Sequence, residues 1–485
     1  MPQPQIVQTV TATTMAELRA RRDAAVHADL VELRLDGVTD LNTIAAVAGH
    51  TRPVIVTCRP VWEGGRWEGD EADRRRIMTT AVAAGAEYVD IERRAGWVPD
   101  LRGTTTRLII SDHDFLAMPT DLAARIGDMR RLGADVVKMA ATAHTLSDTL
   151  RLRDAVATSG DTGARVCIAM GDAGQLTRLL PFHFGSCWTY GGDAAPGQVA
   201  ARELADTYRV RTHTAATRIF GVVGAPIAHS ASPAMHNAAI VAAGLDAVYV
   251  PVLASAVAEA AVVAEALGFA GLSVTAPLKG GWLDHGNVEA DDEASQRLRV
   301  VNTLTRRGDG WRARNLDVAG FLDPLDEAGV PLPAASALVL GAGGAARAAA
   351  FALGRRGANV TIAARRDDAA LQVAADLGVR AMAWPPAGNW DLVVQATSAG
   401  TWPRIDEQPV ASDAIQARVA YDLVYNPEET RFLRDMRQAG AQVIGGLDML
   451  VGQAARQFEW WTERVANRDV MREAARRFVR ERSGS

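Results

Sequence analysis

The first 210 residues alternate eight short apolar runs with segments of helical spacing, and this alternation constrains the fold more than any other feature. The segments between the runs are rich in Ala, Leu and Arg. Eight strands alternating with helices over roughly 200 residues predict a (β/α)8 barrel. An open doubly wound sheet is the alternative, but it requires a glycine-rich first turn, which is absent. The expected strands are 6–12, 30–36, 53–59, 88–93, 107–112, 136–140, 165–170 and 186–191.

Length and composition narrow the functional classes. A chain of 485 residues is long enough for about three domains. Its net charge of −5 and the absence of a long basic run argue against a nucleic-acid groove. We expect no signal peptide, because the N-terminus MPQPQIVQTV lacks a charged region followed by an apolar stretch. We expect no membrane span, because Glu259 and Glu265 interrupt the most apolar long window. Three cysteines cannot form a complete disulfide set, which favours the cytoplasm. No metal site is expected, since His183 and Cys187 have no companion ligands.

Lysine is almost absent from the chain. Of the 52 lysines and arginines, only Lys138 and Lys279 are lysine. A guanidinium stays protonated, whereas a desolvated amine can act as a nucleophile or a proton donor. Two lysines in an arginine background therefore indicate chemistry, with one in each half of the chain.

The strand ends of the predicted barrel carry an amine, an imidazole, carboxylates and guanidiniums. Because Lys138 lies on an apolar strand, we expect desolvation to lower its pKa; nearby arginines would lower it further, while carboxylates would oppose this. A free amine attacks a ketone to give an iminium, which acidifies the adjacent C–H. His113 would move that proton and the arginines would hold an anionic substrate. The residues at these ends are Glu32, Arg34, Arg59, Glu63, Asp90, Glu92, His113, Lys138 and Arg178.

Several stretches in this half resemble type I 3-dehydroquinate dehydratase, over about residues 5–208. They are 31–36 (VELRLD), 58–59, 63–65, 90–92 (DIE), 111–115 (SDHDF), 137–140 (VKMA), 184–186 and 195–198 (APGQ). The resemblance implies a Schiff base at Lys138, acid–base catalysis by His113, and conversion of 3-dehydroquinate to 3-dehydroshikimate. It also implies substrate binding by Glu32, Arg34, Arg59, Glu63, Arg178 and Gln198. Ala194 departs from the family pattern, which usually has a hydroxyl residue there.

A second α/β pattern follows a short connector at 209–218. Strands are expected at 219–224, 247–251, 271–275, 300–305 and 311–315. Further on, the strand 337–340 runs into the glycine turn Gly341, Ala342, Gly343, Gly344 and Ala345, and then into an alanine-rich helix. This is the context of a dinucleotide fingerprint, in which backbone amides approach a pyrophosphate. Arg365 and Arg366 end the next strand, 359–364, and suit the 2′-phosphate of NADP, although Asp367 and Asp368 keep NAD open.

This second half resembles shikimate dehydrogenase, over about residues 219–475. The matching stretches are 224–227, 229–233 (HSASP), 273–279 (SVTAPLK), 301–303, 315–317, 341–344, 396–398, 421–427 (YDLVYNP) and 449–453 (MLVGQ). The resemblance implies that Lys279 and Asp317 handle the proton beside the transferred hydride, and that Thr397 joins the glycine turn in binding the cofactor. It assigns shikimate to Ser230, Ser232, Thr275, Asn302, Asp317, Tyr425 and Gln453. Ser273, Leu316 and Gln395 depart from the family's usual residues.

The sequence therefore predicts an α/β protein with an N-terminal (β/α)8 barrel and a two-domain dehydrogenase. The expected domains are 1–210 for the barrel, 219–325 for substrate binding, completed by helices in 446–485, and 326–445 for a Rossmann-like NADP-binding domain. The two halves would catalyse consecutive steps on small-molecule substrates in the cytoplasm; the sequence leaves a homodimer open. One alternative is a dehydrogenase working on quinate. Another is a catalytically inactive metabolite sensor, against which the intact catalytic residues argue.

Overall fold

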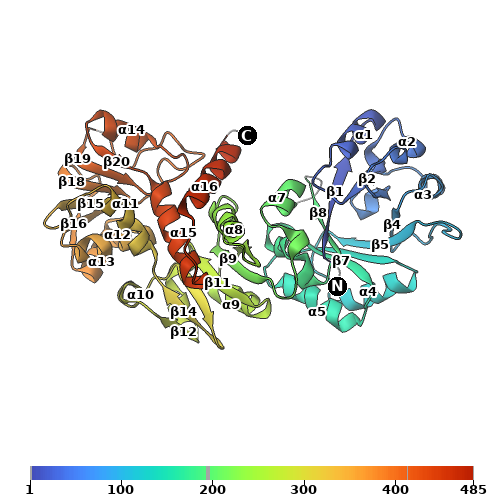
Figure 1. Ribbon diagram of the computed structural model, residues 1–485, viewed down its shortest axis with the longest axis horizontal. Helices are drawn as coiled ribbons and strands as arrows, with labels where there is room; N and C mark the ends of the chain where they lie inside the picture. The colour runs from blue at the N-terminus through green and yellow to red at the C-terminus, as the bar shows by residue number, and fades with distance from the viewer. Residues whose placement is uncertain (1–2, 193–196, 412, 484–485) are drawn as a thin grey trace. The chain divides into compact units, whose positions relative to one another are not determined.

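The computed structural model describes residues 3–192, 197–411 and 413–483 (Figure 1). Contacts divide the chain into two compact units. The first comprises Met1–Arg218 with Val250–Gly268, and the second comprises Ile219–Tyr249 with Phe269–Ser485. Within these described residues there are three sheets, one of eight strands and two of six.

The eight-stranded sheet is a nearly closed parallel barrel, which confirms the predicted fold and excludes the open doubly wound sheet. Its order is β7-β6-β5-β4-β3-β2-β1-β8. Backbone hydrogen bonding joins its two ends, since Cys187 N donates to Arg165 O at 2.8 Å. The strands are β1 (Gln5–Thr11), β2 (Leu30–Arg34), β3 (Val54–Thr57), β4 (Tyr88–Glu92), β5 (Arg107–Asp114), β6 (Val136–Thr142), β7 (Ala164–Met170) and β8 (Trp188–Gly191).

Helices surround these strands because each parallel strand needs cover on both faces. In α4, for example, Ile126 and Met129 are buried on one side of the helix. The strand register then decides which polar side chains meet: Glu92 pairs with Ser111, and Ser111 pairs with Lys138. The helices are α1 (Met15–Asp23), α2 (Thr43–Val47), α3 (Glu71–Ala83), α4 (Leu122–Arg131), α5 (Asp148–Ser159), α6 (Leu176–Leu179) and α7 (Ala201–Asp206).

The second sheet is mixed and has the order β10-β9-β11-β13-β14-β12. Strand β11 runs parallel to β9 and antiparallel to β13. Its strands are β9 (Arg218–Gly224), β10 (Ala247–Leu253), β11 (Phe269–Val274), β12 (Val288–Ala290), β13 (Thr303–Arg307) and β14 (Gly310–Arg314). The helices that follow these strands along the chain are α8 (Ser232–Ala242), α9 (Val257–Ala266), α10 (Glu293–Leu298) and α11 (Asp317–Glu327). The last helices, α15 (Gly446–Thr462) and α16 (Arg468–Ser483), return to pack on α8.

The third sheet is parallel, in the order β17-β16-β15-β18-β19-β20, and has helices on both faces. Successive residues of β15 show this: Ala337 and Val339 join the core with α12, while Leu338 and Leu340 join the core with α14. The strands are β15 (Ser336–Leu340), β16 (Asn359–Ala363), β17 (Arg380–Met382), β18 (Gly388–Gln395), β19 (Ile415–Asp422) and β20 (Gln442–Ile444). Helices α12 (Gly344–Arg355), α13 (Asp367–Leu377) and α14 (Arg431–Gln438) complete the Rossmann-like arrangement.

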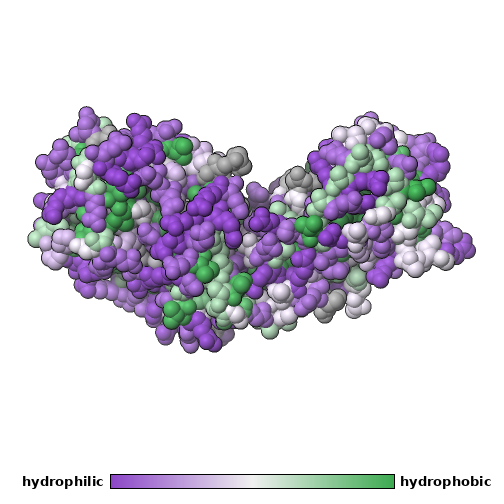
Figure 2. All heavy atoms as spheres, turned by 45° about the horizontal axis from the view of Figure 1, so that its top comes forward, coloured by the Kyte–Doolittle hydropathy of each residue, from purple (hydrophilic) through white to green (hydrophobic). Residues whose placement is uncertain are grey.

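The surface contains both hydrophilic and hydrophobic residues. On the face in Figure 2, hydrophobic residues occur as scattered small groups between hydrophilic ones. Within the described ranges, no helix combines the length and the apolar character needed to cross a membrane.

Candidate active sites

The barrel lysine lies in the interior among carboxylates. Lys138, in β6, is 5% exposed. Its Nζ donates to Glu32 Oε1 at 3.0 Å and to Asp90 Oδ2 at 2.9 Å. The same nitrogen lies 4.3 Å from the centre of the Tyr190 ring, a cation–π contact. The amine is thus held by side chains from β2, β4 and β8.

The expected lowering of the Lys138 pKa is wrong. Burial does lower the pKa of this amine, but the carboxylates of Asp90 and Glu32 outweigh it and raise the pKa above the ordinary value. The resting site therefore holds an ammonium ion. The sequence showed carboxylates at the strand ends, but not that two of them contact the amine.

His113, predicted to transfer a proton, lies on β5, which pairs with β6, the strand of Lys138. It is near the end of β5, where its backbone N donates to Glu63 Oε1 at 2.6 Å; that oxygen is 3.4 Å from its Nδ1. Burial and the nearby cations Arg59 and Lys138 lower the pKa of His113 to about 4, although Glu63 opposes this. The ring is therefore neutral at physiological pH and available to accept a proton.

Two of the predicted substrate-binding arginines already have carboxylate partners. Arg59 donates to Asp90 at 2.8 Å, to Glu92 at 2.8 Å and to Ser111 at 2.7 Å. The Arg34 guanidinium forms two parallel hydrogen bonds to the carboxylate of Asp36, both 2.9 Å long. These contacts orient both guanidiniums and neutralise much of their charge.

Arg178, in α6, is different. It is 2% exposed, and among the described residues its side chain has neither a hydrogen bond nor an ion pair. Burial alone lowers its pKa to about 10. A buried cation without a counter-charge fits an anionic ligand. Gln198 is among the described residues. Residues 193–196, which precede it and include Ala194, are not.

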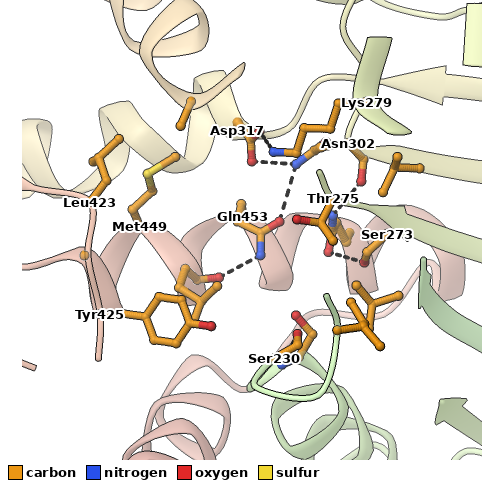
Figure 3. Close-up of a pocket in the computed structure, with 18 of the residues that line it drawn as sticks. Ser230, Ser273, Thr275, Lys279, Asn302, Asp317, Leu423, Tyr425, Met449 and Gln453 are labelled. Atoms are coloured by element: carbon orange, nitrogen blue, oxygen red, sulfur yellow. Dashed lines mark hydrogen bonds and ion pairs between the residues drawn. The ribbon is translucent and has the colours of Figure 1, made fainter. Parts of the chain in front are cut away.

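The second site is a cavity of about 330 Å³ between β9, β11, α11 and α15 (Figure 3). Every residue that the sequence assigned to shikimate or to proton transfer lines it. Its lining contains Ser230, Ser232, Thr275, Lys279, Asn302, Asp317, Tyr425 and Gln453.

This cavity contains an ion pair that one amide, Asn302, contacts. Lys279 Nζ donates to Asp317 Oδ2 at 2.6 Å, and Asn302 Nδ2 donates to Asp317 Oδ1 at 2.8 Å (Figure 3). The same Asn302 nitrogen is 3.4 Å from Gln453 Oε1. An ammonium oriented by a carboxylate is suited to deliver a proton to a developing alcohol.

The glycine turn has the geometry that the fingerprint requires. Gly341 has φ +122°, and a Cβ there would lie 2.9 Å from Ala396 O. Helix α12 begins at Gly344, so its first amides are open to an anion. Beside the turn, Gln395 accepts from Thr397 N at 2.6 Å and donates to Ala399 O at 3.0 Å, which orders the next loop.

The two arginines after β16 fit a phosphate. Arg365 and Arg366 are exposed, and within the described residues neither side chain has a hydrogen bond or an ion pair. Free guanidiniums at this end of the second strand of a Rossmann-like sheet suit the 2′-phosphate of NADP.

Sequence reasoning missed several residues of both sites. Asp90 was recognised as a strand-end carboxylate but not as a contact of Lys138; its signal is the inward-facing alternation of β4. Tyr190 was missed, although it shares a strand face with Trp188. In the second site Gln457 was missed, although it lies one helical turn after Gln453 and lines the same cavity.

The sites and the folds together define a class: a barrel enzyme with a buried amine beside a neutral imidazole, joined to an NADP-dependent reductase. The sequence patterns of three families match. Type I 3-dehydroquinase matches residues 6–215, shikimate dehydrogenase substrate binding domain residues 222–304, and shikimate 5′-dehydrogenase C-terminal domain residues 446–476.

Known proteins agree with this class. A chloroplastic bifunctional 3-dehydroquinate dehydratase/shikimate dehydrogenase from Arabidopsis thaliana is 31% identical over 480 residues, covering 91% of this chain and 79% of that protein. The shikimate dehydrogenase (NADP(+)) of Moorella thermoacetica is 39% identical over 286 residues, covering 56% and 96%. A crystal structure of shikimate 5-dehydrogenase from Thermus thermophilus in complex with NADP(H) and shikimate has a TM-score of 0.50 and 37% identity, covering 54% and 99%. The chain belongs to the family of bifunctional 3-dehydroquinate dehydratase/shikimate dehydrogenases.

Proposed function

We propose that the barrel dehydrates 3-dehydroquinate through an iminium on Lys138, and that the second half reduces the product with NADPH at the Lys279–Asp317 pair. The chain combines 3-dehydroquinate dehydratase and NADP-dependent shikimate dehydrogenase in the shikimate pathway. The observation that carries the residue assignment is that each of the chain's two lysines is held by carboxylates inside a predicted site.

In the barrel, Lys138 first loses the proton that Asp90 and Glu32 stabilise, and this proton ends on the ketone oxygen that leaves as water. The amine attacks the substrate ketone, whose oxygen leaves as water when the C=N bond forms. The neutral imidazole of His113 then takes the proton from the adjacent carbon, and returns a proton to the hydroxyl group that leaves as the second water. Hydrolysis of the iminium consumes one water and restores the lysine. Arg178 supplies the unpaired cation for the substrate carboxylate.

In the second half, NADPH, when bound, supplies a hydride to the ketone of 3-dehydroshikimate. The glycine turn at 341–344 and the amides of α12 would hold its pyrophosphate, and Arg365 and Arg366 would hold its 2′-phosphate. Lys279 delivers the proton to the new alcohol while Asp317 orients the amine. Ser230 and Ser232 line the end of the cavity beside α8 and favour shikimate over the bulkier quinate.

The direct test follows nucleotide absorbance when the chain is mixed with 3-dehydroquinate and NADPH. The wild type should consume NADPH, while Lys138→Met should not. The same variant should reduce added 3-dehydroshikimate at the wild-type rate. A Lys138→Met chain that still converts 3-dehydroquinate would contradict the barrel mechanism, and a wild type inert in both assays would favour the sensor.

Three further expectations accompany this function. Turnover of shikimate should exceed that of quinate with NADP and with NAD. The three cysteines are free thiols, in keeping with a reducing compartment such as the cytoplasm. A homodimer stays open, and sedimentation of the full chain would decide it.

A further inference from the structure

A buried glutamine in the wall of the dehydrogenase cavity forms hydrogen bonds within the protein through both ends of its amide. Gln457, in α15, is 1% exposed. Its Oε1 accepts from Ser273 Oγ at 2.8 Å, and its Nε2 donates to Thr303 Oγ1 at 3.0 Å and to the main-chain oxygen of Asn302 at 3.2 Å. Although Gln457 lines the cavity, neither end of its amide is left over for a ligand.

These bonds fix the direction of every hydrogen bond that follows. Because Thr303 Oγ1 accepts from Gln457, its own hydrogen goes to Asn302 Oδ1 at 2.8 Å. That oxygen also accepts from Leu316 N at 2.8 Å, which leaves Asn302 Nδ2 to face Asp317. The other oxygen of Asp317 accepts a hydrogen bond from Lys279 Nζ (Figure 3). One orientation of the Asn302 amide therefore satisfies the whole chain of bonds.

On the opposite side, the network is anchored in the core. Tyr249 OH donates to Ser273 Oγ at 2.7 Å, and the Tyr249 ring stacks on His236 with centroids 4.2 Å apart. Thr303, Asn302 and Ser273 are themselves at most 5% exposed. A buried and fully satisfied network of this kind is rigid, because each partner that moves leaves another polar group unpaired.

We infer that Gln457 is a positioning residue for ketone reduction: through Thr303 it fixes the amide of Asn302, and thereby the Asp317–Lys279 pair. This inference rests on the proposed role of that pair and deepens it. Without the Gln457 amide, the Thr303 hydroxyl is free to rotate. The side-chain oxygen of Asn302 then keeps only Leu316 N as a fixed donor, so the amide that faces Asp317 is held less firmly. A misplaced proton donor lowers the rate of the chemical step by roughly 10- to 100-fold, while binding of the cofactor stays unchanged.

The test uses the full chain in the variants Gln457→Met, Thr303→Val and the double variant, with Gln416→Met as control. Gln416 is exposed in β19, so the same substitution there should change nothing. Each single variant should lower kcat for 3-dehydroshikimate by about 10- to 100-fold, and leave the KM for NADPH within about twofold. The kinetic isotope effect with deuterated NADPH should rise, because the chemical step becomes rate-limiting. Dehydratase activity of the same chains reports correct folding and should be unchanged.

The double variant should be no worse than the poorer single variant, since both substitutions break one path. Effects that multiply, or a Gln457→Met chain that keeps kcat within about threefold, would overturn the inference. Asp317→Asn separates the two proposals. If it retains wild-type reduction, the proposed proton-handling pair fails; if it loses reduction while Gln457→Met does not, only the role of Gln457 fails.

Discussion

Arg178 offers a prediction in which stability and activity change in opposite directions. Burial lowers the pKa of this guanidinium from its ordinary 12.5 to about 10, with no carboxylate to oppose it. A tenfold change in an equilibrium corresponds to about 1.4 kcal/mol, so holding the charged form costs the folded state roughly 3 kcal/mol at every pH below about 10. Replacing Arg178 with methionine removes this buried charge and keeps much of the side-chain volume.

We expect Arg178→Met to raise the unfolding free energy of the barrel by about 1–3 kcal/mol, and its melting temperature by roughly 5 °C. The same change should lower kcat/KM for 3-dehydroquinate on the order of 10³-fold, because the substrate carboxylate loses its buried partner. Calorimetry of the full chain measures the first effect, with the barrel transition identified in the wild type by loss of dehydratase activity. A direct dehydration assay measures the second.

Arg74 provides the matched control. It is also buried in the barrel, but its guanidinium is paired with Glu92 and Glu71. Arg74→Met leaves Glu92 with one fewer cation, so it should destabilise the barrel by about 3–5 kcal/mol. If Arg178→Met destabilises the barrel as much as Arg74→Met, or keeps dehydratase kcat/KM within about fivefold, the uncompensated-cation reasoning is refuted.

Three other predictions concern the turn, a buried acid and the imidazole. Gly341→Ala should raise the KM for NADPH at least about tenfold, since the new Cβ meets Ala396 O at 2.9 Å. Gly343→Ala, with open space around its Cβ, should leave the melting temperature unchanged. Equal effects of the two substitutions on the melting temperature would contradict this reasoning. Burial raises the pKa of Asp422 to about 7, so its stabilising contribution is complete below its ordinary 3.8 and lost as the pH rises to about 7. Urea unfolding should therefore show a wild-type loss of roughly 3 kcal/mol between pH 5 and pH 8 that Asp422→Asn lacks; parallel pH profiles would refute it. Because the pKa of His113 is lowered to about 4, dehydratase kcat/KM should stay constant down to pH 5.5 and fall only as the pH approaches 4. A fall centred near pH 6.5 would show that the pKa of His113 in the free enzyme is not lowered.

The barrel was predictable because its strands are buried on both faces and read as uninterrupted apolar runs. The run 88–93 became Tyr88–Glu92, and 165–170 became Ala164–Met170. The third sheet was only partly visible. Its edge strands Arg380–Met382 and Gln442–Ile444 have three residues each and are partly exposed, so they carry neither an apolar run nor a clear alternation.

The sites divide in the same way. Motifs identified the side chains that line the dehydrogenase cavity, because short stretches of the chain carry several of them at fixed spacing. The pKa of Lys138 was not predictable, since its sign depends on whether Asp90 from another strand reaches the amine. Gln457 was hidden for a similar reason: its partners Ser273 and Thr303 are more than 150 residues away in sequence. Register and packing decide such contacts.

The central claim is that the two lysines do different chemistry, one as a nucleophile and one as a proton donor. Because the chain has only these two lysines, borohydride reduction during turnover of 3-dehydroquinate, followed by mass spectrometry of peptides, tests it directly. We predict a reduced substrate adduct on the peptide that contains Lys138 and an unmodified peptide around Lys279. An adduct on Lys279, or turnover without any adduct on Lys138, would contradict the account.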